Sequence, residues 1–290
     1  MSVTSIFKTS ILSIFLLFIA ASNLHAQTPV GFKVMSYNIW GLPVPIKLKH
    51  PGIARIAQAL PYYNPDVVAF QETFTKRADI LAHVKEYPFV SYGPHVKKGI
   101  TFLSSGLLTI SKYPIVKTQS MVYSHCTSFD CFASKGVLLT TILHPQYGEI
   151  DFYNTHTNAG KSKKVKWSQL AELLLFIQKT NQGNPIILSG DMNITPDTGF
   201  YSFLQSTFLA DGHELYVQDH PELSPELKSS FTHVSKKALS KKLIKKKIDY
   251  IWTDDRHMLY PINTQVVFDG SHDENKYSDH FALMTNFEFR

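Results

Sequence analysis

The amino-acid sequence predicts an α/β protein whose β-sheets contain both parallel and antiparallel strands. Short apolar runs rich in β-formers alternate with segments in which apolar residues repeat at helical spacing. Several strand-like runs also follow one another with no helix between them. In a purely parallel sheet, helices usually connect successive strands, so some of these strands are expected to be antiparallel. The chain has 290 residues, 44% of them hydrophobic, and no internal repeat or linker-like tract. We therefore expect one large core.

The expected elements follow from these patterns along the chain. A strand at residues 33–39 precedes a helix whose apolar face spans residues 53–60, and Pro61 is expected to end that helix. A second apolar helical stripe spans residues 170–177. The remaining strands are expected at residues 67–70, 106–110, 137–143, 150–155, 185–188, 248–252, 262–268 and 281–287.

The segment from Met1 to Ala26 has the composition of a secretory signal peptide. It carries one cation, Lys8, then an apolar run, and it ends on a small residue. The unbroken apolar run is about half the roughly 20 residues that a membrane-spanning helix needs. We expect cleavage before Gln27, a single mature domain at residues 27–290, and a secreted monomer outside the cell or in the periplasm.

Positive charge is concentrated in one segment. The net charge is +6, and seven lysines lie between Lys236 and Lys247 without any acidic residue. The rest of the mature chain is slightly acidic, which disfavours a general nucleic-acid binder. We expect the lysine segment to contact an anionic membrane surface, with a merely solubilising loop as the alternative.

The chain contains two cysteines, Cys126 and Cys131. An exported protein meets oxidising surroundings, but the sequence leaves open whether the two thiols form a disulfide. Two cysteines without a second pair make a structural zinc site a poor interpretation.

Polar side chains gather at the ends of the expected strands, where α/β proteins usually build their sites. Carboxylates and amides predominate among them, and two histidines accompany them. Such an oxygen-rich set suits Mg²⁺, which prefers one or two carboxylates together with water and phosphate oxygens. The set comprises Asn38, Glu72, His156, Asp191, Asn193, Asp249, Asp279 and His280.

In their order along the chain, these motifs resemble the endonuclease/exonuclease/phosphatase superfamily. That superfamily includes DNase I-like nucleases, abasic-site endonucleases, inositol polyphosphate 5-phosphatases and neutral sphingomyelinases. The resemblance implies a DNase I-like fold, which is a four-layer sandwich of two mixed β-sheets flanked by helices.

The resemblance also implies roles for individual residues. It assigns Glu72, Asn38 and Asp279 to a Mg²⁺ site, with Mn²⁺ or Co²⁺ as alternative metals. It assigns catalysis of in-line water attack to the remaining residues of the set, with Asp249 fixing the tautomer of one histidine. These catalytic residues are His156, Asp191, Asn193, Asp249 and His280.

Three segments are similar to neutral sphingomyelinases. They are Asn-Ile-Trp-Gly-Leu-Pro from Asn38, Ser-Lys-Tyr-Pro-Ile ending at Ile115, and Asp130 followed five residues later by Lys135 before a glycine. The resemblance implies that Lys135 binds substrate phosphate and that Asp130 positions it. Asn158 is assigned to the same substrate-binding group. An ordinary solvated loop is the alternative for Asp130 and Lys135.

The resulting hypothesis is a secreted Mg²⁺-dependent phosphodiesterase that hydrolyses sphingomyelin, a phospholipid at a membrane surface, to ceramide and phosphocholine. A secreted DNase I-like nuclease and a phosphoinositide phosphatase remain as alternatives. The 5-phosphatases are expected to carry Trp-Cys-Asp-Arg where this chain has Lys-Ile-Asp-Tyr-Ile-Trp. A binding module without catalytic activity is expected to lack one of the metal-binding residues. In this chain every inferred position carries the expected residue type.

Overall fold

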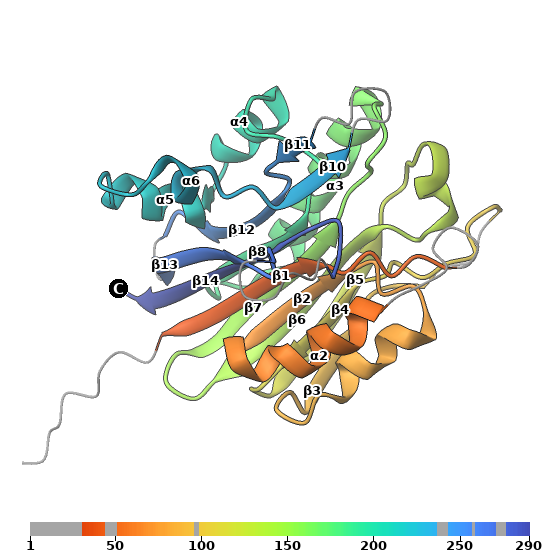
Figure 1. Ribbon diagram of the computed structural model, residues 1–290. Coiled ribbons are helices and arrows are strands. Elements are labelled where there is room, and N and C mark those ends of the chain that lie inside the picture. Colours follow the sequence, from red (N-terminus) through yellow and green to blue (C-terminus); the bar gives the residue numbers. More distant parts are fainter. Residues whose placement is uncertain (1–30, 44–50, 96–98, 237–242, 257–258, 271–276) are drawn as a thin grey trace, which may run out of the picture. The chain divides into compact units, whose positions relative to one another are not determined.

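The computed structural model describes residues 31–43, 51–95, 99–236, 243–256, 259–270 and 277–290 (Figure 1). Gly31 to Arg290 belong to one compact unit. The expected signal peptide at residues 1–26 and the expected cleavage point before Gln27 lie outside the described residues.

Two six-stranded sheets form the centre of this unit. The first sheet has the order β13-β14-β1-β2-β4-β3, and the second has the order β5-β6-β7-β8-β12-β9. The strands of the first sheet are β1 (Phe32–Asn38), β2 (Val67–Gln71), β3 (Phe89–Tyr92), β4 (Leu108–Ser111), β13 (Leu259–Val267) and β14 (Ala282–Phe289). Those of the second are β5 (Ile115–Val122), β6 (Gly136–His144), β7 (Gly148–His156), β8 (Ile186–Asp191), β9 (Leu209–Asp211) and β12 (Asp249–Asp254).

Each sheet contains one parallel pair of neighbouring strands. β1 pairs with β2 in parallel, and β7 pairs with β8 in parallel. The other pairs in both sheets are antiparallel. The predicted mixture of strand directions is confirmed.

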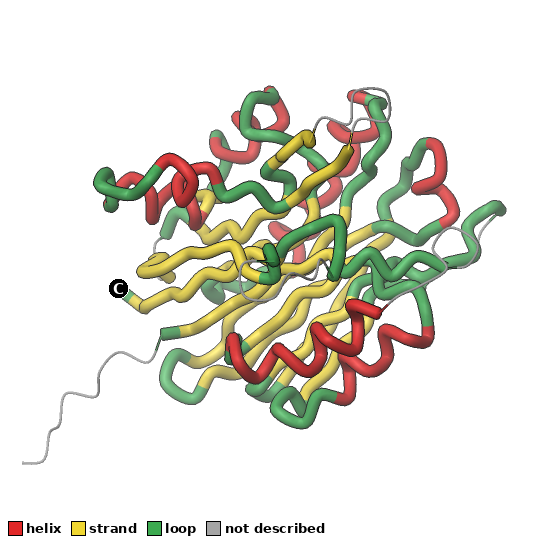
Figure 2. Tube along the Cα trace, in the orientation of Figure 1, coloured by secondary structure: helices red, strands yellow, loops and turns green. Residues whose placement is uncertain are grey.

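Helices cover the outer faces of the two sheets (Figure 2). α2 (Pro51–Tyr63) and the 3-10 helix η1 (Lys76–His83) pack on the first sheet, and α3 (Lys163–Thr180) and α4 (Gly199–Gln205) pack on the second. A third apolar cluster joins residues of both sheets, among them Val34 of β1 and Ile187 of β8. The four-layer sandwich is therefore confirmed.

Shorter elements complete the described chain. They are the 3-10 helix η2 (Ser128–Phe132), α5 (Gly212–Asp219), α6 (Pro225–Ser229) and the antiparallel hairpin of β10 (His233–Lys236) with β11 (Leu243–Lys246). Within the described residues, no helix combines the length and the apolar composition that crossing a membrane requires.

The prediction that Pro61 ends the first helix is wrong, because α2 continues to Tyr63. Pro61 lies in the last turn, and the Asn64 amide still closes that turn by donating to the Leu60 carbonyl at 2.9 Å. Five short or polar strands, β3, β5, β9, β10 and β11, have no counterpart among the expected elements. Their residues lack the long apolar runs by which the other strands are recognised.

Candidate active site

Three candidate catalytic residues lie in one row across the second sheet. His156 ends β7 and stands opposite Asp191, which ends β8, and Asp191 stands opposite Asp249, the first residue of β12. All three side chains are buried. Strand pairing alone therefore brings together residues that are separated by 93 positions in the chain.

Gly190 permits the close spacing at this row. Its φ of +147° is one that side chains rarely adopt, and a Cβ there would lie 2.0 Å from the Thr155 carbonyl oxygen of β7. The glycine of the Gly-Asp-Met-Asn motif is thus required by the backbone. It lets β8 pass β7 closely enough to present Asp191.

The first sheet contributes Asn38 and Glu72 to the same place. Asn38 ends β1, and its Nδ2 donates to Glu72 Oε1 at 3.1 Å and to Asp191 Oδ2 at 3.0 Å. Glu72 directly follows β2, whose last residue, Gln71, donates to Asn154 Oδ1 of β7 at 2.9 Å. The two sheets are therefore tied together at the site by buried amides.

His280 lies against two of the buried carboxylates. Its Nδ1 is 2.8 Å from Asp249 Oδ2, and its Nε2 is 3.8 Å from Asp191 Oδ2. Burial disfavours the imidazolium, but the nearby carboxylates of Asp249 and Asp191 outweigh it and raise the pKa of His280. Burial also raises the pKa of Asp249. The Nδ1–Oδ2 contact is of hydrogen-bond length, so Asp249 and His280 lie together as the family resemblance implied.

Asp191 is held as a carboxylate. Burial alone would raise its pKa, but His156, His280 and Lys135 together hold the pKa of Asp191 well below its usual range. His156 Nε2 lies 3.3 Å from Asp191 Oδ2. A charged acceptor is thus fixed at the centre of the row.

Lys135 and Asp130 belong to this site, which argues against an ordinary solvated loop. The Lys135 ammonium lies 2.6 Å from Asp130 Oδ1, 2.9 Å from His156 Nε2 and 3.0 Å from the Thr157 carbonyl oxygen. Asp130 Oδ2 accepts hydrogen bonds from the Ala159 and Gly160 amides. Lys135 is buried, and its charge outweighs burial in lowering the pKa of Asp130.

Lys166, on α3, is a residue that the sequence reasoning missed. Its ammonium donates to the carbonyl oxygens of Asn158 and Asn193, both at 2.7 Å. Burial lowers the pKa of Lys166 to about 8. The side chain ties the loop after β7 to the loop after β8. Lysine at the start of an amphipathic helix is usually solvent-exposed, so the sequence held no sign of this contact.

Asn158 and Asn193 are held within these loops rather than free in solvent. Asn158 is buried and bonds to Thr127 and Gln169 through its side chain and amide. Asn193 donates from its backbone to Asp191 Oδ1 at 2.9 Å and from Nδ2 to the Thr157 carbonyl at 3.2 Å. Asn193 and Glu72 both have positive φ, of 50° and 60°, which is uncommon for residues other than glycine.

His233 is the second residue that the sequence reasoning missed. It begins β10, pairs with His280 across an isolated bridge, and its ring lies 4.8 Å from the His280 ring. His233, Asp279 and His280 bring possible ligand atoms within 4.8 Å of one another. Burial lowers the pKa of His233. Nothing in the sequence around His233 marks it, because the hairpin places it there.

These residues surround one pocket of about 380 Å³, here called the central pocket. It is lined by Glu72, Asp130, Lys135, His156, Lys166, Asp191, Asn193, His233, Lys246, Asp279 and His280, among others. Every predicted site residue either lines the pocket or directly contacts a residue that does. The structure therefore brings the predicted set together.

The predicted metal ligands fit a hard divalent cation. Glu72 Oε2 is buried and has no hydrogen-bond partner among the described residues, although its other oxygen accepts from Asn38. A buried carboxylate oxygen without a donor is costly unless a cation or water meets it. Asp279 also lines the central pocket. This oxygen-rich donor set is of the kind that Mg²⁺ accepts.

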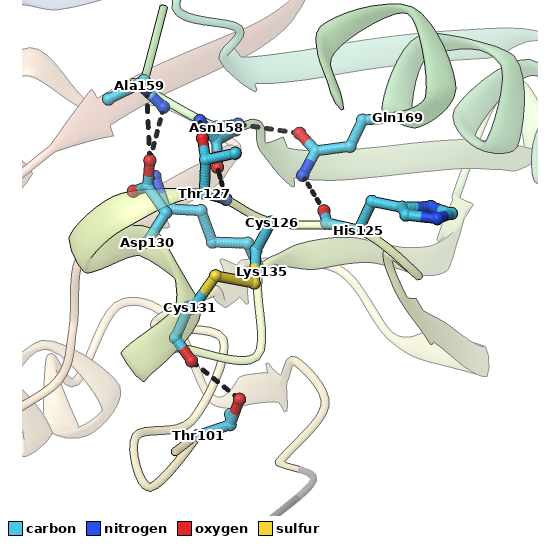
Figure 3. The surroundings of a disulfide bond; sticks show 11 residues. Thr101, His125, Cys126, Thr127, Asp130, Cys131, Lys135, Asn158, Ala159 and Gln169 are labelled. Carbon is cyan, nitrogen blue, oxygen red and sulfur yellow. Dashed lines mark hydrogen bonds and ion pairs between the residues drawn. A yellow bond between two sulfur atoms is a disulfide. The ribbon is translucent and has the colours of Figure 1, made fainter. Parts of the chain in front are cut away.

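The structure settles the state of the two cysteines. Cys126 and Cys131 form a disulfide that brackets Asp130 (Figure 3). The bond anchors η2, which carries the carboxylate that faces Lys135.

The expectation of one basic surface from Lys236 to Lys247 needs correction at its end. The Lys247 ammonium is buried 2.7 Å from Asp211 Oδ2 and is not available to a membrane. Lys246 lines the central pocket, and Lys245 is exposed. Lys237, Lys241 and Lys242 lie outside the described residues, as does the side chain of Lys236.

Comparison with known proteins places this site in a wider group. Residues 35–280 match the model of the Endonuclease/Exonuclease/phosphatase family. A sphingomyelinase of Mycobacterium tuberculosis is 28% identical over 170 residues, which is 56% of this chain and 34% of that protein. The chain thus matches about a third of that relative's length. A phospholipase C of Staphylococcus aureus is 26% identical over 259 residues, covering 78% of this chain and 74% of the relative.

Solved structures share the fold at lower identity. The crystal structure of SmcL has a TM-score of 0.69 at 21% identity and covers 90% of this chain and 100% of its own. Beta toxin from Staphylococcus aureus, crystallised with bound magnesium ions, has a TM-score of 0.64 at 22% identity, covering 89% and 99%. TDP2 of D. rerio, complexed with a single-strand DNA product, has a TM-score of 0.68 at 16% identity, also covering 89% and 99%. These likenesses concern the fold.

Proposed function

The chain belongs to the endonuclease/exonuclease/phosphatase family, and from this premise we propose that it is a Mg²⁺-dependent phosphodiesterase that hydrolyses sphingomyelin to ceramide and phosphocholine. The observation that carries the proposal is that His156 and Asp191 line one pocket with Glu72, whose Oε2 has no hydrogen-bond partner among the described residues. Asp249 continues the row beside Asp191 and contacts His280 of the same pocket. The sphingomyelinase and phospholipase C relatives support the choice of substrate.

The metal would be held by Glu72, Asn38 and Asp279, with Mn²⁺ or Co²⁺ as alternatives to Mg²⁺. The magnesium ions bound by beta toxin favour the first choice. When bound, the ion offsets charge on the phosphate oxygens and stabilises the leaving alkoxide.

The remaining residues orient water and substrate. The water oxygen bonds to phosphorus in line with the P–O bond that breaks; the attacking water gives up one proton, and the leaving oxygen takes up one to become a hydroxyl. Asp191, held ionised, accepts a hydrogen bond from the attacking water, and Asn193 keeps its carboxylate in place. Asp249 fixes the proton on His280 Nδ1, which leaves Nε2 directed towards Asp191.

Two side chains of the pocket, Lys135 and His156, bind the substrate phosphate. Lys135 offers an ammonium that Asp130 holds in place beside His156. Because Lys135 and His156 are buried, their interaction with an anionic oxygen is weakened less by water than at the surface.

A panel of substrates tests this function. The purified chain is incubated with sphingomyelin, phosphatidylcholine, a phosphoinositide or plasmid DNA, each with Mg²⁺ and with chelator. We expect phosphocholine from sphingomyelin with Mg²⁺ and none with chelator. Inorganic phosphate from the phosphoinositide alone would indicate a phosphatase. Cleavage of DNA alone would indicate a nuclease, the alternative that the TDP2 likeness favours.

We also propose export and contact with an anionic membrane. Amino-terminal sequencing of the protein recovered outside the cytoplasm should begin at Gln27. Each lysine near an anionic surface contributes about 1 kcal/mol, within a Debye length of about 8 Å. Replacing Lys241, Lys242 and Lys245 with Gln should therefore weaken sedimentation with vesicles containing phosphatidylserine, most strongly at low salt. Binding equal to the wild type at low and physiological salt would leave the segment a solubilising loop.

A further inference from the structure

A second cleft adjoins the central pocket and differs from it in chemistry. This side cleft, of about 560 Å³, is walled mostly by apolar groups, including Ile100, Val122, Tyr123, Ala133 and the Cys126–Cys131 disulfide. Lys135 lines both cavities. Its ammonium faces Asp130 and His156, so the hydrocarbon stem of the side chain is the part left to border the cleft.

The walls of the side cleft are tied together by the fold. Thr101 Oγ1 donates to the Cys131 carbonyl at 2.7 Å, and the Leu103 amide donates to the Phe132 carbonyl at 2.9 Å (Figure 3 shows the first). On the other side, Gln169 Nε2 donates to the His125 carbonyl at 2.8 Å. The disulfide joins these two sides. These hydrogen bonds and the disulfide therefore fix the positions of the cleft walls.

Exposed apolar side chains continue the lining of the cleft outward. Ile100, which lines the cleft, is 62% exposed, and Phe102 and Phe129 are 56% and 82% exposed. The rings of Phe102 and Phe129 lie 5.4 Å and 6.1 Å from that of Phe132. Large apolar side chains clustered on a surface mark a site that contacts an apolar partner.

The two cavities together match a molecule with a charged and an apolar part. We propose that the side cleft binds the hydrocarbon portion of an amphiphilic phosphodiester whose phosphate occupies the central pocket. This inference rests on the proposed function and deepens it, because it concerns how a lipid is distinguished from other phosphodiesters. The cleft has the size of a small-molecule site, and a lining that is mainly apolar is typical of such sites.

The charges around the cleft argue against a nucleic-acid strand as its occupant. Among the described residues that line it, Lys135 is the only lysine or arginine, and it is already paired with Asp130. Single-stranded nucleic acid is usually bound in grooves lined by many cations that follow the phosphates. An alkyl chain requires no such cations.

Binding of dodecylphosphocholine below its micelle concentration tests the proposal. Titration calorimetry in the presence of chelator compares this probe with phosphocholine, which lacks the chain. We expect the wild type to bind dodecylphosphocholine at least tenfold more tightly. Ala133→Trp, which fills the cleft, and Ile100→Asp, which places a charge at its edge, should each abolish that difference.

Ile80→Asp is the matched control, because Ile80 is 45% exposed on η1 and lines neither cavity. It should bind both probes as the wild type does. Ile100→Asp keeps the test decisive if Ala133→Trp fails to fold, since Ile100 is exposed. Equal wild-type affinity for the two probes, or an undiminished chain preference in Ile100→Asp, would overturn the proposal.

Hydrolysis of sphingomyelin by the same wild-type preparation separates this inference from the proposed function. Phosphocholine release without a chain preference in binding would refute the side cleft alone. A chain preference that the variants abolish, without any phosphocholine release, would refute the proposed activity and leave the side cleft as an amphiphile site.

Discussion

Replacing Lys247 with Met should destabilise the protein strongly, although Lys247 belongs to a lysine-rich segment that the sequence predicts to be exposed to solvent. The Lys247 ammonium lies 2.7 Å from Asp211 Oδ2, and both side chains are buried. Asp211 also accepts from the Tyr201 hydroxyl at 2.9 Å and from the His213 amide at 3.0 Å. The substitution therefore leaves a buried carboxylate without its cation.

The expected loss is large because the remaining charge cannot reach water. Removing one partner of a buried ion pair costs about 3–5 kcal/mol. In a domain of this size each kcal/mol lowers Tm by roughly 2–4 °C, so we expect a fall of roughly 6–20 °C. Thermal and urea unfolding, followed by circular dichroism at pH 7, measure both quantities.

Two further variants identify the cause. Lys245→Met removes an exposed lysine from the same hairpin and should change stability by less than about 0.5 kcal/mol. Lys247→Met combined with Asp211→Asn removes the charge, keeps an oxygen for the His213 amide and offers an amide group from which the Tyr201 hydroxyl can accept, and should recover most of the loss. A Lys247→Met variant as stable as Lys245→Met would refute the reasoning.

The pH dependence has a defined sign. Burial raises the pKa of Asp211, but Lys247 outweighs it, so the folded pKa lies below the unfolded value of about 3.9. The unfolded state then binds more protons between these two values, and the stabilisation present above about pH 3.9 is lost as pH falls through the folded pKa. In Lys247→Met the unpaired carboxyl protonates more readily. Its stability deficit against the wild type should therefore narrow between pH 7 and pH 4.

Three other substitutions test the site. Glu72→Ala should lower turnover by roughly 10³-fold, about 4 kcal/mol, with an unchanged circular dichroism spectrum, and near-normal turnover at saturating Mg²⁺ would contradict the metal assignment. Lys166→Met should lower kcat by up to roughly 10²-fold, because two site loops lose their shared donor; a stopped assay measures this, and an unchanged kcat would remove Lys166 from the site. Gly190→Ala should reduce the yield of folded protein because its Cβ meets the β7 backbone, and a variant with wild-type Tm would show that the strands can separate at little cost.

The sequence predicted those parts of the site that depend on where strands end. Asn38, Asp191 and His156 each terminate a strand with an apolar core, and such strands are visible as short apolar runs. The four-layer arrangement followed from the order of the motifs rather than from any local pattern. It is confirmed by the two sheets and their outer helices.

The parts that could not be predicted depend on contacts between distant segments. Lys166 lies in a helix and His233 in a hairpin, and the sequences of both elements are typical of exposed segments. Only tertiary packing brings the two side chains to the pocket. The pairing of Cys126 with Cys131 depended on whether η2 brings the two side chains together. Lys247 was expected to be exposed but is buried against Asp211. The pattern of charges in the sequence does not distinguish the individual lysines of a basic segment.

Because His156, Asp191 and Asp249 form one row across three strands, catalytic turnover depends on the correct register of these strands. Successive side chains of a strand point to opposite faces, so a slip of β12 by one residue would turn Asp249 away and present Tyr250 or Ile248 in its place. Such a misfolded molecule would keep most of its backbone pairing and remain compact. It would nevertheless lack the carboxylate that holds His280. During refolding, recovery of turnover should therefore lag behind recovery of β-sheet whenever the final alignment of β12 is the slow event.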